Sequence, residues 1–259
     1  MTRVISIVSG KGGVGKTVTV ANLGVLLASK FNKKVVVIDC NLTNPHLGIY
    51  LGSLNFWPVN LNDVIRNKAT LDQAMYKHHS GVYVIPASFE SRHLIRLNNY
   101  RLKHKLNKLF DEFQADIVLL DSPPGLTRDA LMTFSLSSEI IFVATPHIPA
   151  IIDINKSCQQ LKGKDGKPIG IVLNRMKNKK YELTEDEIFN FSNLPIIGRV
   201  PEDDYVLQST NFKMPVASAF PKADSSKEFL RLAAYIAGEA PAPEPNRSGL
   251  SRFLGFFRK

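Results

Sequence analysis

A glycine-rich stretch near the N-terminus constrains the fold more than any other feature of the chain. Residues 10–17 read Gly-Lys-Gly-Gly-Val-Gly-Lys-Thr. A β-branched apolar run at 4–8 precedes them and residues 18–31 have helical periodicity, so the glycines join a strand to a helix. In such a turn, backbone N–H groups and the helix N-terminus can surround a phosphate. The predicted phosphate loop comprises Gly10, Lys11, Gly12, Gly13, Val14, Gly15, Lys16, Thr17 and Val18.

Three polar side chains of this loop suit a nucleoside triphosphate. We expect Lys16 to neutralise β- and γ-phosphate oxygens and the Thr17 hydroxyl to ligate Mg²⁺. Lys11 is a second cation beside the same phosphates. Its chemistry fits either extra neutralisation within its own chain or an arginine-finger role toward the nucleotide of a partner chain.

Two more apolar runs each end on an aspartate. Residues 35–38 precede Asp39, and residues 117–120 precede Asp121. Continuous apolar runs of this kind are typical of parallel strands buried on both faces. Because ligands of open parallel sheets bind at the carboxyl ends of the strands, both carboxylates should lie beside the phosphate loop. There they can hold Mg²⁺ together with Thr17.

Strand and helix patterns alternate along the rest of the chain. This alternation predicts the α/β class, with a single doubly wound, mainly parallel sheet and helices on both faces. A chain of 259 residues with 44% hydrophobic residues can form one such domain, assigned to 1–237. Further strands are expected at 82–86, 140–144 and 169–173. Helices are expected at 62–67, 71–76, 92–108 and 229–237, and two more begin at 150 and at 184. Residues 225–228 have the spacing of a capping box for the helix at 229–237.

Composition narrows the class of protein. The chain has no apolar run near the ~20 residues of a membrane-spanning helix and no signal-peptide pattern, so we expect a soluble intracellular protein. Two distant cysteines argue against a disulfide framework, a zinc site or an iron–sulfur cluster. A net charge of +10 favours an anionic partner: nucleotide, nucleic acid or membrane. The basic helix at 92–108 is either a solvated cover for the sheet or a patch that attracts DNA or anionic lipid.

The composition changes sharply after the last expected helix. Residues 238–249 are rich in proline and are expected to form an extended linker. In residues 250–259, large apolar side chains recur at i, i+3, i+4 and i+7 between basic residues, which predicts an amphipathic helix for an anionic membrane surface. The alternative is a terminal helix packed on its own core. The expected membrane contacts are Leu250, Arg252, Phe253, Leu254, Phe256, Phe257, Arg258 and Lys259.

The loop sequence Lys-Gly-Gly-Val-Gly-Lys-Thr, with its extra Lys11, resembles the deviant phosphate loop of the MinD/ParA family of dimerising ATPases. The resemblance implies a P-loop fold, Mg²⁺-dependent ATP hydrolysis and an ATP-bound homodimer in which Lys11 reaches the partner's nucleotide. The residues implied in catalysis are Lys11, Lys16, Asp39, Asn41 and Asp121.

One position departs from the family pattern. The first switch usually contains two aspartates in the order Asp-x-Asp, whereas here the second position is Asn41. An amide can orient a water molecule but cannot accept its proton, so hydrolysis is expected to be slow or to need a partner.

The same resemblance assigns the rest of the nucleotide site. Residues 122–125 resemble the second switch, in which Gly125 allows the backbone to approach the γ-phosphate. Asn174 and Arg175 lie where the family reads the adenine base. Pro201, Glu202 and Asp203 resemble the loop that closes over that base.

With its tethered amphipathic tail, the chain resembles the MinD branch more than the ParA branch. That branch implies a membrane switch in the spatial regulation of cell division or cell-pole positioning, in which the ATP-bound dimer binds membrane and hydrolysis releases it. It also implies a cytoplasmic protein that binds reversibly to the inner face of the cell membrane and works with an activating or recruited protein. The alternative is a ParA-like ATPase that partitions DNA through a basic surface.

Overall fold

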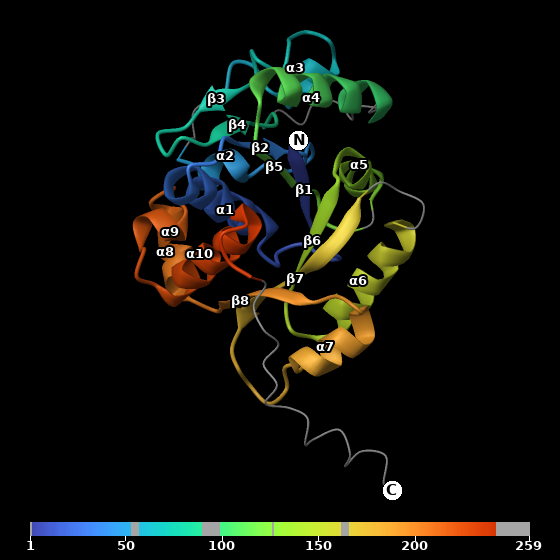
Figure 1. The fold of residues 1–259 in the computed structure, drawn as a ribbon, viewed down its shortest axis with the longest axis vertical. Coiled ribbons are helices and arrows are strands. Elements are labelled where there is room, and N and C mark those ends of the chain that lie inside the picture. Colours follow the sequence, from blue (N-terminus) through green and yellow to red (C-terminus); the bar gives the residue numbers. More distant parts are fainter. Residues whose placement is uncertain (1, 53–56, 90–98, 126, 162–165, 242–259) are drawn as a thin grey trace, which may run out of the picture.

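The computed structural model describes residues 2–52, 57–89, 99–125, 127–161 and 166–241. Within them, eight strands form one sheet in the order β3-β4-β2-β5-β1-β6-β7-β8 (Figure 1). All neighbours are parallel except β3 and β4, which confirms the expected mainly parallel sheet. The strands are β1 (Arg3–Val8), β2 (Val35–Asp39), β3 (Tyr76–Lys77), β4 (Tyr83–Ile85), β5 (Ile117–Asp121), β6 (Glu139–Ala144), β7 (Lys167–Met176) and β8 (Ile196–Pro201).

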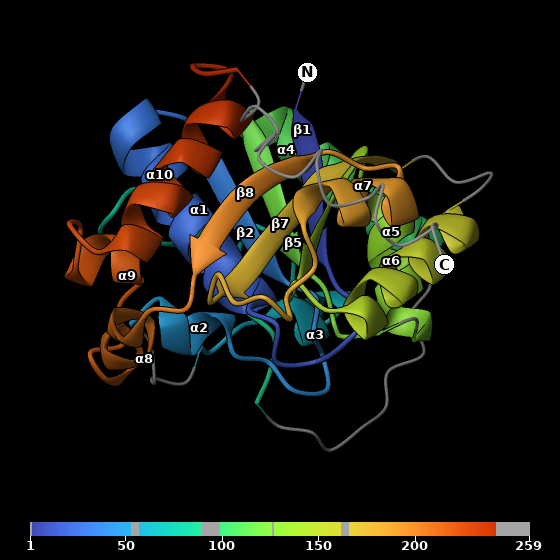
Figure 2. The ribbon, with the colours of Figure 1, turned by 90° about the horizontal axis from the view of Figure 1, so that it is seen from below.

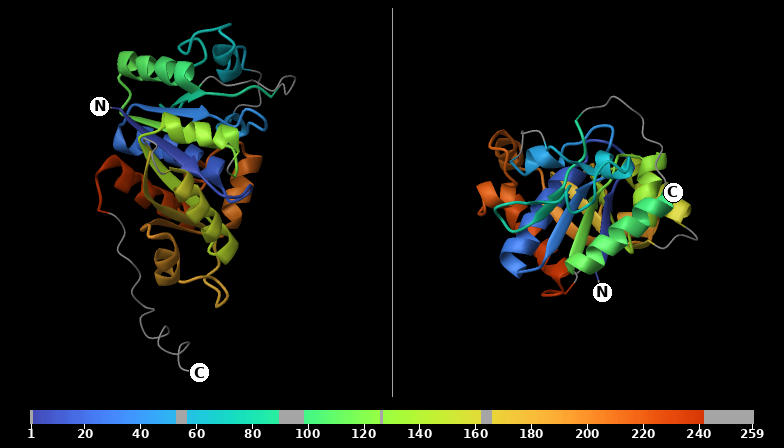
Figure 3. Two further views of the ribbon diagram at one scale, coloured as in Figure 1. Left: turned by 90° about the vertical axis from the view of Figure 1, so that its right-hand side faces the viewer. Right: turned by 90° about the horizontal axis from the view of Figure 1, so that it is seen from above.

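Helices cover both faces of this sheet (Figures 1 and 3). Alternate residues of the central strands, such as Ile5 and Ile7 against Val4 and Val8, enter separate apolar cores. One core packs under α1 (Lys16–Phe31), α9 (Val216–Ala219) and α10 (Asp224–Ala237), and Figure 2 shows α10 lying along α1. The opposite face is covered by α3 (Leu61–Ile65), α4 (Asn99–Phe113), α5 (Arg128–Leu136), α6 (Ile148–Leu161) and α7 (Glu185–Ser192). The remaining short helices are α2 (Leu47–Tyr50) and α8 (Asp204–Asn211).

Two local predictions were wrong. Residues 71–76 form turns that lead into β3 and not a helix, because Tyr76 pairs with Val84 across an antiparallel ladder. The last helix begins at Asp224 with Ala223 as its N-cap, so residues 225–228 do not form a capping box. Ser225 lies inside the helix, and its hydroxyl donates instead to Asp203 Oδ2 at 2.7 Å.

Several elements start or end differently from the sequence pattern. Helix α4 ends at Phe113, five residues beyond the expected end, and residues 92–98 of the expected helix lie outside the described residues. The sequence pattern does not predict strands β3 and β8 or helices α2, α5, α8 and α9. The amphipathic tail at 250–259 and most of the linker also lie outside the described residues. Among the described helices, none has the length and apolar content needed to cross a membrane.

Candidate nucleotide site

The phosphate loop connects β1 to α1 at the centre of the sheet. Gly15 has φ 100°, and a Cβ there would lie 2.1 Å from Asn174 Nδ2, so only glycine fits this position. Lys16 is the first residue of α1 and is 7% exposed. Its Nζ donates to Ser9 Oγ at 2.8 Å, and burial lowers its pKa although the nearby charge of Asp121 raises it. The loop therefore holds a largely desolvated cation at a helix N-terminus.

Ser9 is a site residue that the sequence analysis missed. Its hydroxyl accepts from Lys16 and donates to the carbonyl oxygen of Lys11 at 2.6 Å. It is buried and links both lysines of the loop. Its only sequence signal is its place between the apolar strand and Gly10.

The two expected carboxylates lie side by side. Asp39 and Asp121 end adjacent parallel strands and are direct register partners. Asp121 Oδ2 accepts from the Thr17 hydroxyl at 2.7 Å. Its other oxygen, Oδ1, is buried without a hydrogen-bond partner among the described residues. A buried carboxylate oxygen left unpaired beside a hydroxyl and a second carboxylate fits an oxygen-ligated cation such as Mg²⁺.

Burial controls the charge of this pair. It raises the pKa of Asp121 to about 6, while the hydrogen bond from Thr17 and the charge of Lys16 act in the opposite direction. The pKa of Asp39 is also raised, first by burial and then by Asp121. Two desolvated carboxylates at the ends of adjacent strands repel each other, and a divalent cation held by both would remove that repulsion.

The first switch is tied to Asp39 through its backbone. Asp39 Oδ2 accepts from the N–H groups of His46 and Leu47, both at 3.1 Å, and Oδ1 accepts from the N–H of Asn41 at 3.0 Å. The Asn41 side chain turns back on its own loop. Its Nδ2 donates to the carbonyl oxygen of Asn44 at 2.8 Å, and its Oδ1 accepts from the Asn44 N–H at 3.3 Å. Asn41 thus braces a tight turn.

The second switch and the start of α6 border the phosphate loop. The N–H of Gly125 donates to the carbonyl oxygen of Ser9 at 3.0 Å, which brings the expected second switch to the loop. A Cβ on Gly10 would lie 2.0 Å from Asp153 Cβ, so α6 packs directly against the loop. Lys11 is exposed, and its ammonium forms no ion pair within the described part of the chain.

The two segments expected at the adenine base are neighbours. Met176 pairs with Pro201, and the Glu202 N–H donates to the Met176 carbonyl oxygen at 2.9 Å. This pairing brings Asn174 and Arg175 toward the loop at 201–203. Asn174 is buried, and its Nδ2 donates to the carbonyl oxygen of Val14 at 2.7 Å. Arg175 is exposed in a left-handed conformation, with φ 58°.

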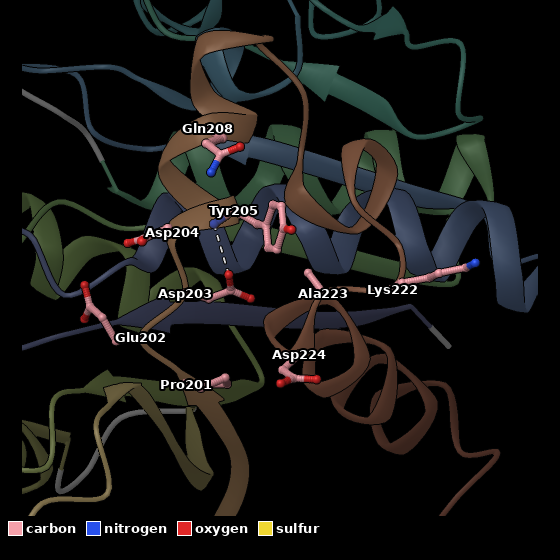
Figure 4. A pocket seen from close by; sticks show the side chains of 9 residues that line it. All are labelled: Pro201, Glu202, Asp203, Asp204, Tyr205, Gln208, Lys222, Ala223 and Asp224. Atoms are coloured by element: carbon pink, nitrogen blue, oxygen red, sulfur yellow. Dashed lines mark hydrogen bonds between the residues drawn. The ribbon is translucent and has the colours of Figure 1, made fainter.

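Asp203 has structural partners in this arrangement. Its Oδ1 caps α8 by accepting from the Tyr205 N–H at 3.0 Å, and its Oδ2 accepts from the N–H and hydroxyl of Ser225. Figure 4 shows the carboxylate pointing toward the start of α10. These bonds lower the pKa of Asp203 against the opposing effect of burial, which is the largest single influence. Asp203 therefore fixes the end of the loop that includes Pro201 and Glu202.

Comparison with known proteins agrees with this geometry. The family model of the CobQ/CobB/MinD/ParA nucleotide binding domain matches residues 5–216. An uncharacterised ATP-binding protein of Methanocaldococcus jannaschii is 34% identical, over 98% of this chain and 96% of the relative. The septum site-determining protein MinD of Thermotoga maritima is 34% identical, over 92% and 89% respectively.

A solved structure supports the same assignment. The septum site-determining protein MinD of Pyrococcus horikoshii, complexed with Mg-ADP, superimposes with a TM-score of 0.84 at 30% identity, covering 91% of this chain and 96% of its own. The family model covers most of the chain, and both MinD proteins align with nearly all of it. The chain belongs to the MinD/ParA family of P-loop nucleotide-binding proteins, and its homologues include MinD.

Proposed function

We propose that the protein is an Mg²⁺-dependent ATPase that dimerises on ATP, binds membrane as a dimer and leaves it after hydrolysis. The observation that supports ATP and Mg²⁺ best is Asp121 Oδ1, which has no hydrogen-bond partner among the described residues and lies beside Thr17 and Asp39 next to the phosphate loop. Homologous MinD proteins are named for septum-site determination. We therefore assign this protein to the spatial regulation of cell division or cell-pole positioning.

Different residues of the chain would bind the metal ion, the phosphates and the adenine base. Thr17, Asp39 and Asp121 would hold Mg²⁺, which when bound supplies positive charge to the β- and γ-phosphates. Lys16 neutralises the same oxygens from the start of α1, and the loop N–H groups surround them. Asn174 and Arg175 would contact the adenine base together with Pro201 and Glu202, and Asp203 anchors the loop at 201–203 through its bonds to Tyr205 and Ser225.

Lys11 is the residue through which dimerisation would control ATP hydrolysis. Its exposure and lack of an ion pair among the described residues leave its ammonium available to a second chain. We infer that Lys11 of each subunit contacts the phosphates bound by the other, as an arginine finger does. Hydrolysis then depends on dimerisation, which couples the nucleotide state to the number of tails presented together.

The coupling to membrane rests on avidity. One tail buries a few large apolar side chains at roughly 1.5–3 kcal/mol each before ordering costs, which gives weak binding. A second tail in the same dimer raises the overall affinity by roughly 10²–10⁴. The protein is then cytoplasmic as a monomer and peripheral on the inner face of the cell membrane as a dimer. A protein partner that stimulates hydrolysis or is recruited by the dimer completes the cycle.

Lys11 provides a test of the dimer. Lys11→Ala should leave ATP binding largely intact but abolish hydrolysis, because each active site then lacks the partner's cation. Mixing it with Asp121→Asn, which is impaired in its own metal site, should restore about one competent site per mixed dimer. Phosphate release from each variant and from the mixture checks this. A mixture no more active than the sum of its parts would contradict action across the dimer.

Asn41 is expected to limit the basal rate. Asn41→Asp supplies the carboxylate usual in the family and should raise basal ATP turnover, since a carboxylate can take a proton from water. The change also removes the hydrogen bond from Asn41 Nδ2 to the carbonyl oxygen of Asn44. If Asn41 only stabilises this turn, turnover should stay equal or fall and the first switch should become less ordered. Steady-state phosphate release at saturating ATP distinguishes the two roles. Thr43→Ala, which removes only the 3.2 Å bond to Asn41 Oδ1, is the matched control for loop loosening.

The raised pKa of Asp121 predicts a pH-dependent requirement for metal. Below its pKa of about 6 the carboxyl binds a proton in place of Mg²⁺, so the half-saturating Mg²⁺ concentration should rise about tenfold for each pH unit. Titration of nucleotide binding with Mg²⁺ between pH 5 and pH 8 measures the effect. Asp121→Asn should flatten the profile, and an equally steep profile in that variant would assign the proton to another group.

The DNA-partitioning alternative needs a basic surface, and two lysines of the described part of α4 form contacts within their own chain. Lys105 donates to the carbonyl oxygen of Val64 and to Asn67 Oδ1, at 3.0 and 2.7 Å. Lys108 pairs with Glu112 at 3.7 Å. These contacts favour the interpretation of α4 as a cover for the sheet.

A further inference from the structure

An aromatic cluster lies exposed beside the loop at 201–203. The ring of Phe220 lies 4.7 Å from that of Tyr205 and 5.9 Å from that of Phe212, measured between centroids. Tyr205 is 46% exposed and Phe212 is 62% exposed. Single exposed apolar side chains are ordinary, but grouped aromatic rings in contact with solvent indicate a surface that another segment covers.

Four carboxylates and one ammonium, that of Lys222, line a hollow next to these rings. The hollow has a volume of about 550 Å³ and lies between the start of α8 and the start of α10 (Figure 4). Among its acidic residues, Asp203 is bonded internally and Asp224 pairs with Lys227. Glu202 and Asp204 are exposed and form no ion pair with other described residues. We define the acidic aromatic surface as Glu202, Asp204, Tyr205, Phe212 and Phe220.

Residues 250–259 of the same chain complement this surface. They include three cations, Arg252, Arg258 and Lys259, and no acidic residue. Their apolar positions recur at helical spacing, so one face can cover aromatic rings while the flanking cations meet carboxylates. Both the apolar character and the charge of the surface are therefore matched.

The length of the chain allows the contact. Helix α10 starts at the hollow with Asp224 and ends at Ala237, about 21 Å away at 1.5 Å per residue. The linker at 238–249 is rich in proline and spans up to about 37 Å in extended form. Residues 250–259 can therefore return along α10 to the acidic aromatic surface of their own chain.

We propose that residues 250–259 dock on the acidic aromatic surface of the same chain and are thereby withheld from membrane. The tail's apolar face covers Tyr205, Phe212 and Phe220, and its cations lie against Glu202 and Asp204. A docked tail leaves the monomer less able to bind a vesicle than a free tail would. The consequence for membrane rests on the proposed function, whereas the intramolecular contact does not.

Photo-cross-linking of the full chain tests the contact. Phe256 is not one of the tail positions that recur at i, i+3, i+4 and i+7, so a benzoylphenylalanine in its place reports on docking and keeps Phe253 and Phe257. Without nucleotide or lipid, irradiation should join position 256 to the region from Glu202 to Asp224 within one molecule. Cross-links elsewhere in the chain, or only between two chains, would overturn the proposal.

Matched variants of α8 decide whether the rings carry the contact. Tyr205→Ser combined with Phe212→Ser should lower the intramolecular cross-link and weaken docking by about tenfold, because two aromatic contacts are lost. Leu207→Ser is the control, since Leu207 is 64% exposed on the same helix and is not part of the acidic aromatic surface. An equal effect of the control, or an unchanged cross-link in the double variant, would contradict the proposal. Circular dichroism verifies that each variant is folded.

The vesicle readout separates this proposal from the proposed function. In the double variant, sedimentation with anionic vesicles in the absence of nucleotide should increase several-fold, because the tail is free. A specific cross-link with no vesicle binding in any protein or nucleotide state would refute the membrane function and leave the docking contact established. ATP-dependent vesicle binding without the cross-link would refute the docking contact and support the membrane function.

Discussion

The Lys16→Ala variant should bind ATP about 100-fold more weakly than the unmodified protein. A charge-assisted bond made in a desolvated site contributes more than one at the surface, and Lys16 is 7% exposed at the start of α1. Thermal unfolding should change little, since the substitution removes a buried cation whose pKa burial already lowers. Calorimetric titration with ATP and Mg²⁺ measures the affinity.

Lys30→Ala is the control for general charge effects. Lys30 lies in the last turn of the same helix and is exposed, so its loss lowers the net charge equally without touching the phosphate loop. ATP affinity should stay within about twofold in this variant. Equal affinities in Lys16→Ala and Lys30→Ala would remove the phosphate-loop assignment.

Replacing Phe253 and Phe257 together by glutamate should abolish membrane binding. The two charges fall in the middle of the tail's apolar face, where each opposes burial and is repelled by anionic headgroups. The bound fraction with ATP should fall to the level seen without nucleotide. ATP binding and dimerisation should persist, because neither substituted position belongs to the nucleotide site or to the core that the described residues form.

Ser248→Glu combined with Ser251→Glu is the matched control, because it adds the same charge near the tail and keeps the apolar face. This control variant should retain substantial membrane binding.

Thermal unfolding addresses the alternative of a tail packed in the core. The Phe253 and Phe257 double variant should unfold within about 2 °C of the unmodified protein, since charges on a tail outside the core stay solvated. A midpoint lowered by many degrees would show that the tail is structural.

The centre of the site could be predicted because its residues follow clear local patterns. Strands buried on both faces are continuous apolar runs, so the sequence pattern alone predicts that Asp39 and Asp121 lie at strand ends. The phosphate loop combines glycines with Lys16 and Thr17 between a strand and a helix. Parallel topology then brings all four residues to one edge of the sheet, as the register of β2, β5 and β1 confirms.

The parts that escaped prediction depend on contacts distant in sequence. Asp203 bonds Ser225, 22 residues away, and this contact helps place Ser225 inside α10 and not at its cap. Residues 71–76 were expected to be helical, yet pairing with β4 makes Tyr76 a strand residue. The bracing of the switch by Asn41 depends on the turn around Asn44, which composition alone does not reveal.

Co-sedimentation with anionic vesicles in the presence of ATP, ADP or no nucleotide tests whether ATP controls membrane binding. The full chain should pellet with vesicles in ATP and Mg²⁺, and should stay mainly in the supernatant in ADP or without nucleotide. The contrast should reach the roughly 10²–10⁴ expected for two linked tails against one. Pelleting to the same extent in all three conditions would contradict an ATP-operated membrane switch.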